Sequence, residues 1–141
     1  MIEIDRHIRE RINIETVGSV YEEWKRRGFL DESIKFFENL TQEASEPLIH
    51  SFVTHVHKEK GLFIDIIAEQ FNIPQKLRRP LALSADILWA MSLMLDDIQD
   101  ADSTRGGMAS SWAKFGLERT KLSLKESFSS LGKTLTGSFG N

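Results

Sequence analysis

Three carboxylates and one arginine form the densest group of chemically useful side chains in this 141-residue chain. Asp96, Asp97 and Asp100 end a run that is otherwise apolar, and Arg105 follows shortly after them. On a helix, Asp96 and Asp100 share a face, where their charges repel each other unless a cation offsets them. A helix C-terminus disfavours negative charge as well, so a merely solvated helix end is the weaker interpretation.

Oxygen ligands without neighbouring cysteine or histidine favour Mg²⁺ over zinc. The chain contains no cysteine, which excludes thiolate catalysis and zinc–cysteine sites. Mg²⁺ is typically held by one or two carboxylates, several waters and the oxygens of a substrate phosphate. The planar guanidinium of Arg105 is suited to grip such a phosphate with two parallel hydrogen bonds. The aspartates are therefore predicted to bind Mg²⁺, and Arg105 to bind phosphate.

Composition narrows the class of protein. The formal net charge is -3, with acids and bases interspersed, so we expect no nucleic-acid partner. The longest apolar run, 87–95, is far shorter than a membrane span, and the first residues are charged where a secretory signal is apolar. We expect a soluble, cytoplasmic protein with a single helical domain over residues 1–141. Few segments favour strands, which predicts an all-α helical bundle.

Apolar residues recur at helical spacing along most of the chain. Residues 81–98 are apolar on nearly all sides, which predicts a central buried helix whose C-terminal end carries the aspartates. Residues 103–111 are expected to form a loop, and the tail from 136 is expected to fray. Further helices are predicted over residues 4–24 (one helix or a pair, closed by Gly28), from Asp31, from Ser45, over 62–71 after a break at Gly61, and from Trp112 to Leu135.

Other polar and aromatic residues are interpreted as structural. Trp24, Trp89 and Trp112 are expected to be core aromatics, with the border of a hydrocarbon cavity as the alternative for Trp89, and His50 is expected to belong to a polar helix face. The basic group Lys76, Arg78 and Arg79 is interpreted as solvated charge at a helix start.

The aspartates, the arginine and their surroundings resemble the first aspartate-rich motif of the trans-isoprenyl diphosphate synthases, the polyprenyl synthetase family. That pattern is Asp-Asp-x-x-Asp, four residues, and Arg-Arg-Gly; here Asp96-Asp97-Ile98-Gln99-Asp100 is followed at the same offset by Arg105-Gly106-Gly107. The flanking segments 68–89 and 110–116 are similar to the family as well, so the resemblance covers roughly residues 55–116.

The resemblance implies a partial isoprenoid synthase fold, made of the N-terminal helices that surround a cavity for prenyl diphosphate chemistry. It implies that the three aspartates hold Mg²⁺ ions that bind the diphosphate of an allylic prenyl substrate, and that Arg105 contacts this diphosphate. The prenyl tail would lie beside Met91, Ser92 and Leu95. In the family, the allylic cation then reacts with isopentenyl diphosphate.

The positions that bind isopentenyl diphosphate in the family are altered here. Its Gly-Lys-x-x-Arg-Pro residues correspond to Val56, His57, Lys60 and Gly61, its histidine to Trp89, and its second arginine to Gly106. His57 and Lys60 still offer positive charge to a phosphate. No second aspartate-rich motif follows Gly116, so half of the family's diphosphate clamp is absent.

We therefore expect a divergent trans-prenyltransferase unit that binds an allylic prenyl diphosphate through Mg²⁺ and needs further sequence or a partner chain for elongation with isopentenyl diphosphate. The altered second-substrate positions leave open a terpene-synthase-like ionisation without isopentenyl diphosphate. A non-catalytic subunit of a heteromeric synthase and a purely structural helical protein are further alternatives. A truncated bundle exposes apolar surface, which favours a homo- or hetero-oligomer.

Overall fold

The computed structural model describes residues 15–54 and 58–140. These residues form seven helices and one two-stranded sheet, which confirms the expected all-α bundle. The part of the first predicted helical segment before residue 15, and His57, lie outside the described residues. The elements are α2 (Glu15–Arg26), α3 (Phe29–Glu38), α4 (Gln42–Thr54), α5 (Glu59–Gln70), α6 (Gln75–Gln99), β1 (Thr104–Arg105), β2 (Met108–Ala109), α7 (Ser111–Phe115) and α8 (Leu117–Phe139).

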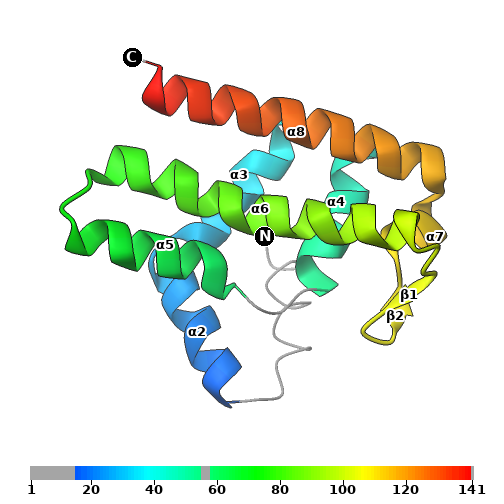
Figure 1. Cartoon of the computed structure of the whole chain (residues 1–141), viewed down its shortest axis with the longest axis horizontal. Coiled ribbons are helices and arrows are strands. Elements are labelled where there is room, and N and C mark those ends of the chain that lie inside the picture. Colours follow the sequence, from blue (N-terminus) through cyan, green and yellow to red (C-terminus); the bar gives the residue numbers. More distant parts are fainter. Residues whose placement is uncertain (1–14, 55–57, 141) are drawn as a thin grey trace.

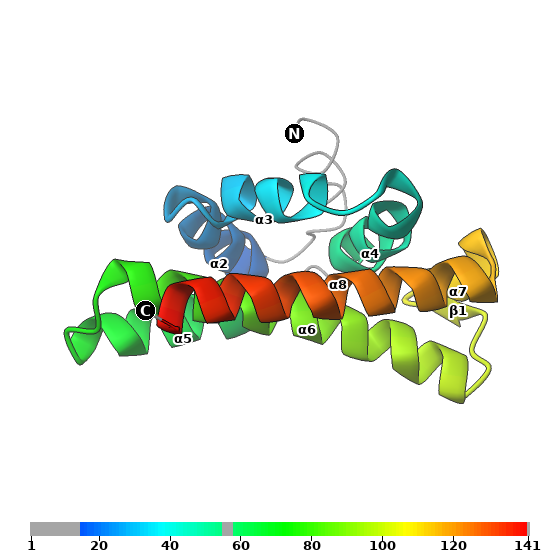
Figure 2. The ribbon, with the colours of Figure 1, turned by 90° about the horizontal axis from the view of Figure 1, so that it is seen from above.

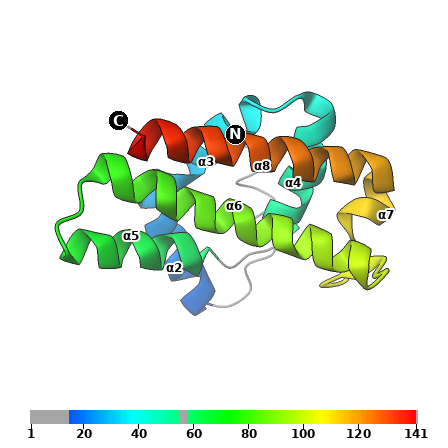
Figure 3. The same ribbon diagram turned by 45° about the horizontal axis from the view of Figure 1, so that its top comes forward.

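The helices are arranged in two layers. α5, α6 and α8 lie side by side with α6 in the middle (Figures 1 and 3). α2, α3 and α4 form the second layer, which covers one face of the first (Figure 2). The 25-residue α6 is the central element because it contacts helices of both layers.

An aromatic cluster fills the space between the layers. The fully buried ring of Trp24 lies 5.9, 6.3 and 6.1 Å from the ring centroids of Tyr21, Phe29 and Phe52. Aromatic side chains bury large apolar areas, so this cluster contributes strongly to the free energy of folding. It confirms the core position expected for Trp24.

Asp86 on α6 connects three helices at the edge of this cluster. The indole N–H of Trp24 donates to one carboxylate oxygen at 2.9 Å, and the backbone N–H of Gly61 donates to the other at 2.9 Å. A Cβ at residue 61 would overlap this carboxylate and the carbonyl oxygen of Ala82. The expected helix break at Gly61 is therefore wrong: α5 runs through it, and the missing side chain lets α5 approach α6 closely.

Lys58, directly before α5, is buried beside this junction. Its Nζ donates to the carbonyl oxygen of Phe52 at 2.6 Å and lies 3.5 Å from the centroid of the Phe52 ring. Burial lowers the pKa of Lys58 well below its usual range, although the negative charges of Asp86 and Glu59 oppose this shift. Burial likewise raises the pKa of Asp86.

A second polar junction holds the start of α6. The fully buried carboxylate of Asp65 accepts hydrogen bonds from Arg27 at 2.8 Å and from Arg78 at 2.9 Å. Both guanidinium groups also bond to Glu69, at 3.2 and 2.9 Å. The interpretation of Arg78 as a solvated charge is therefore wrong, because its guanidinium joins α6 to α5 and, through Asp65, to the end of α2.

Several element boundaries differ from the sequence predictions. α6 starts at Gln75 rather than near residue 81, and Pro80 lies inside it. The contact of Arg78 with Asp65 packs these additional N-terminal residues of the helix against α5. α8 continues through the tail that was expected to fray, up to Phe139. No helix in the described residues is both long enough and apolar enough to span a membrane.

We expect Asp65→Asn to lower the free energy of unfolding by about 3 kcal/mol, because it removes the buried negative charge that Arg27 and Arg78 share and leaves them only the more exposed Glu69 as a common partner. Denaturant unfolding measures the change. Glu118→Gln is the matched control, since it removes an exposed carboxylate whose ion pair with Lys121 contributes only about 0.5 kcal/mol. Equal losses in the two variants would contradict the structural importance of the Asp65 junction.

Lys58→Met should flatten the pH dependence of stability above neutral pH. The folded state depresses the pKa of Lys58, so the unfolded chain holds this proton up to about pH 10.4 while the folded chain releases it earlier. Stability of the natural chain should consequently rise between neutral pH and about pH 10 by an amount that the variant lacks. Lys121→Met, at an exposed lysine, should keep the rise. Denaturant titrations at several pH values test this; parallel profiles for all three proteins would refute it.

Candidate functional site

The C-terminal end of α6 is closed by a left-handed residue. Ala101 has φ 57°, and its N–H donates to the carbonyl of Ile98 at 3.4 Å. The N–H of Asp102 donates to the carbonyl of Asp97 at 2.9 Å, which completes a Schellman motif after the C-cap residue Asp100. This cap reverses the chain, so that the residues after it return toward the helix end.

A short hairpin follows this reversal. β1 and β2 pair through Arg105 and Met108, with Gly106 at φ 58° and Gly107 at φ 79° between them. Positive φ at both central residues is the requirement of a type I′ turn, which glycine meets without strain. The prediction of a loop over 103–111 missed this pairing. The same requirement gives a physical reason for glycine at residue 106, where the resembling family carries its second arginine.

The hairpin lies beside the C-terminal end of α6 (Figure 1), and Arg105 on β1 pairs with the aspartates there. Its Nη2 lies 2.6 Å from a carboxylate oxygen of Asp96, and its Nε lies 2.8 Å from one of Asp97. Asp97 is buried, and this burial raises its pKa against the lowering effect of the hydrogen bond from Arg105. Asp96 and Asp100 are exposed. The structure therefore brings the predicted arginine and two of the three aspartates together.

Two residues that hold this arrangement were not identified as part of a site from the sequence. The indole N–H of Trp112 is shared between the carbonyl oxygens of Asp97 at 3.0 Å and Asp102 at 2.9 Å. Nε2 of His50 donates to the carbonyl oxygen of Ala109 at 2.7 Å. His50 is buried rather than on a polar face, so that interpretation is wrong. Both side chains bond to backbone carbonyls, which every residue carries, so the residue types in the sequence give no sign of these contacts.

The carboxylates fit a magnesium ion by their chemistry and in part by their placement. Within residues 15–54 and 58–140, no group of three or more acidic or histidine side chains could hold a metal ion. Asp97 is buried against Arg105. Asp96 also pairs with Arg105 but is exposed, and the exposed Asp100 lies one helical turn away from it. This pair fits the one or two carboxylates by which proteins usually hold Mg²⁺.

An apolar groove lies between α6 and α8. Its volume is about 490 Å³, and Leu95, at its α6 side, directly precedes Asp96. Met91, Ser92 and Leu95, beside which the resemblance places the prenyl tail, all line this groove. The lining residues are Leu88, Met91, Ser92 and Leu95 from α6 and Leu124, Lys125 and Phe128 from α8.

The described remainder of the second-substrate region lies along the opposite side of α6. Nζ of Lys60 is 3.8 Å from the centroid of the Trp89 ring and 3.3 Å from a carboxylate oxygen of Glu59. Trp89 precedes Asp96 by seven residues, about 10 Å along the helix axis. The structure thus places Lys60 beside Trp89 and not beside the carboxylates at the end of α6. Trp89 is partly exposed, so its interpretation as a core aromatic is wrong.

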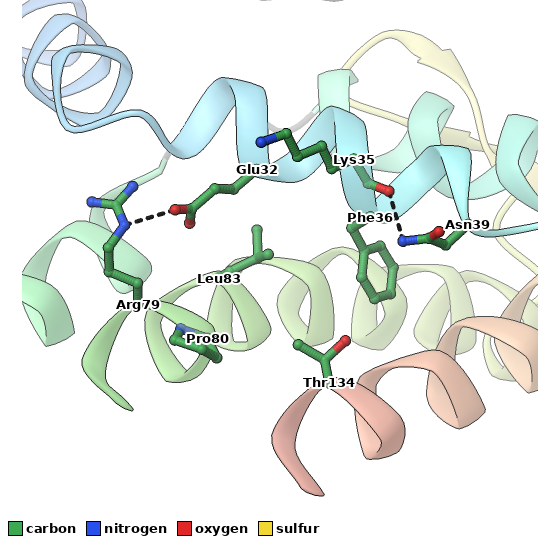
Figure 4. A pocket seen from close by; sticks show the side chains of 8 residues that line it. All are labelled: Glu32, Lys35, Phe36, Asn39, Arg79, Pro80, Leu83 and Thr134. Carbon is green, nitrogen blue, oxygen red and sulfur yellow. Dashed lines mark hydrogen bonds and ion pairs between the residues drawn. The ribbon is translucent and has the colours of Figure 1, made fainter. Parts of the chain in front are cut away.

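A different cavity, of about 240 Å³, lies where α3, α6 and α8 meet (Figure 4). At its edge, Nε of Arg79 lies 2.7 Å from a carboxylate oxygen of Glu32, and the guanidinium also covers the ring of Phe29 at 4.4 Å. Arg79 is therefore ion-paired rather than solvated. Because this cation already has its counter-charge and lies near the start of α6, the cavity is no part of the aspartate site.

Ala101→Gly should raise the free energy of unfolding by about 1 kcal/mol, because a side chain at φ 57° carries a steric cost that glycine avoids. Chemical denaturation measures the gain. Asn72→Gly is the matched control: Asn72 occupies the same left-handed position after α5, and asparagine tolerates that conformation better. A gain at residue 101 no larger than that at residue 72 would count against this description of the cap.

Searches against family models, curated proteins and solved structures found no match to this chain. The resemblance to the polyprenyl synthetase family therefore rests on the aspartates, Arg105 and their flanking residues, and it stays a prediction.

Proposed function

We propose that this chain binds an allylic prenyl diphosphate, with the diphosphate at the C-terminal end of α6 and the hydrocarbon tail in the groove between α6 and α8. The observation that carries the proposal is the position of this groove next to the charged cluster along α6, since Leu95 lines the groove and Asp96 is the next residue of the helix. An apolar groove close to a small group of charged side chains matches a ligand with an apolar tail and a charged head.

Each part of the ligand has residues suited to it. Asp96 and Asp100 would hold Mg²⁺, whose charge would offset that of the diphosphate. Arg105 uses Nε and Nη2 for the aspartates, which leaves Nη1 as a donor for a phosphate oxygen. The side chains of Met91 and Leu95 shield the tail from water, which is the main source of affinity for a hydrocarbon.

The proposed protein is of the trans-prenyltransferase type, and binding of the allylic diphosphate is the first step of that reaction. Loss of the diphosphate from an allylic substrate is promoted where positive charge neutralises the leaving group. This chain supplies that charge from one side only, so chain elongation would need further sequence or a partner chain. Terpene-synthase-like ionisation and a non-catalytic binding subunit remain the alternatives that an activity assay separates.

Calorimetric titration with a non-hydrolysable farnesyl thiolodiphosphate tests the binding site. We expect binding in the presence of Mg²⁺ and a loss of at least about tenfold in affinity for Asp96→Asn and for Arg105→Ala, because each removes a charge-assisted contact. Ser92→Phe narrows the groove, so it should weaken the farnesyl analogue more than the shorter geranyl analogue.

Glu118→Gln, which alters an exposed carboxylate outside the site, should bind as the natural chain does. The proposed site is wrong if Asp96→Asn and Ser92→Phe both keep the natural affinity. Incubation with farnesyl diphosphate and Mg²⁺, with and without isopentenyl diphosphate, then separates the reactions: product that forms equally in both excludes elongation, and product only with isopentenyl diphosphate excludes the terpene-synthase-like alternative.

A further inference from the structure

The cavity between α3, α6 and α8 has an apolar middle and polar side chains at both ends (Figure 4). Phe36 of α3 forms the middle together with Pro80 and Leu83 of α6. The volume of about 240 Å³ is smaller than that of pockets for drug-sized ligands, so the cavity suits a molecule built on a single ring. Arg79, at one end, precedes Asp96 by 17 residues, roughly 26 Å along α6. The cavity is therefore separate from the proposed diphosphate site.

The end of the cavity beside Arg79 carries a net positive charge. The charges of Arg79 and Glu32 offset each other in their ion pair, whereas Lys35 adds a second cation and extends along α3 toward Glu32 (Figure 4). No carboxylate of the described residues lies within ion-pair distance of the Lys35 ammonium group. Arg79 bonds to Glu32 through Nε, which leaves Nη1 and Nη2 as donors. This end of the cavity therefore suits a carboxylate, because charged donors bind anionic oxygen atoms strongly.

The opposite end of the cavity offers hydrogen-bond acceptors. Asn39 and Thr134 lie there, and both also line a neighbouring polar hollow between α3 and α8. The side-chain amide of Asn39 donates to the carbonyl oxygen of Lys35 at 3.0 Å, which leaves Oδ1 as an acceptor. The hydroxyl of Thr134 donates to the carbonyl oxygen of Ser130 at 3.0 Å, which leaves its lone pairs as acceptors. A hydroxyl group of a ligand can donate to either of these oxygen atoms.

We propose that this cavity binds a small hydroxyaryl carboxylic acid. The carboxylate lies between Lys35 and Arg79, the ring lies against the apolar middle, and the hydroxyl lies at the acceptor end. An aromatic body is favoured because contact with the Phe36 ring adds to the burial of apolar area. The length agrees as well: Glu32 and Asn39, at the two ends, are seven residues apart on α3, about 10 Å along the helix. A carboxylate and a phenolic hydroxyl that are joined by a ring and a two-carbon link span a comparable distance.

Titration of the chain with 3-(4-hydroxyphenyl)propionate, followed by backbone amide NMR, tests the proposal. We expect a dissociation constant on the order of 100 µM for so small a ligand, with shifts at Phe36, Leu83 and Thr134 and none at Asp96. 3-Phenylpropionate lacks the hydroxyl and should bind about fivefold more weakly. Tyramine, which carries an ammonium group in place of the carboxylate, should not bind. Binding of tyramine as tight as that of the acid, or shifts that gather at Asp96 instead, would overturn the proposal.

Two variants test the two ends of the cavity separately, with circular dichroism showing that each one folds. Lys35→Gln removes the additional positive charge and should weaken both acids about fivefold. Thr134→Val removes an acceptor but keeps the side-chain shape, so it should weaken only the hydroxylated acid. Lys121→Gln, at an exposed lysine outside the cavity, should leave both affinities unchanged. The proposal is wrong if Lys35→Gln keeps the natural affinities or if Thr134→Val weakens both acids equally. No prenyl diphosphate is present, so this result is independent of the proposed function.

Discussion

The buried carboxylate of Asp86 is the constraint on which the helix arrangement depends. A carboxylate removed from water requires hydrogen-bond donors, and here they come from Trp24 on α2 and from the backbone of Gly61 on α5. Both helices are thereby held at defined positions against α6. The neighbouring amine of Lys58 belongs to the same junction, and burial shifts the pKa of this base down and the pKa of Asp86 up.

α6, which carries Asp86, is also held at its start and contributes two different faces to the structure. Its start is held through Arg78, and its C-terminal end carries the aspartates. One face is buried on the second layer, whereas the other borders the groove and exposes Leu81, Leu88 and Leu95. Because the charged end and one wall of the apolar groove belong to the same helix, their relative position is set by rigid backbone rather than by loops, as the proposed site for an amphipathic ligand would require.

Local patterns predicted much of the fold, and contacts between distant residues account for what was missed. Helical periodicity predicted the all-α architecture and a central helix that ends in the aspartates. The same local rules failed at Gly61, where close packing of two helices required a glycine inside a helix. They also failed at His50 and Trp112, whose hydrogen bonds to backbone carbonyls depend on where the hairpin folds.

The sequence by itself determined the spacing of Asp96 and Asp100, one turn apart on a helix, and the glycines that permit a tight turn after them, because helix period and backbone freedom are local properties. Only the tertiary structure decided that Arg105 returns to the aspartates and that Asp97 turns inward. It also decided that α8 lies beside α6 to form the groove. These outcomes depend on a chain reversal and on packing between elements distant in sequence, which no short-range pattern specifies.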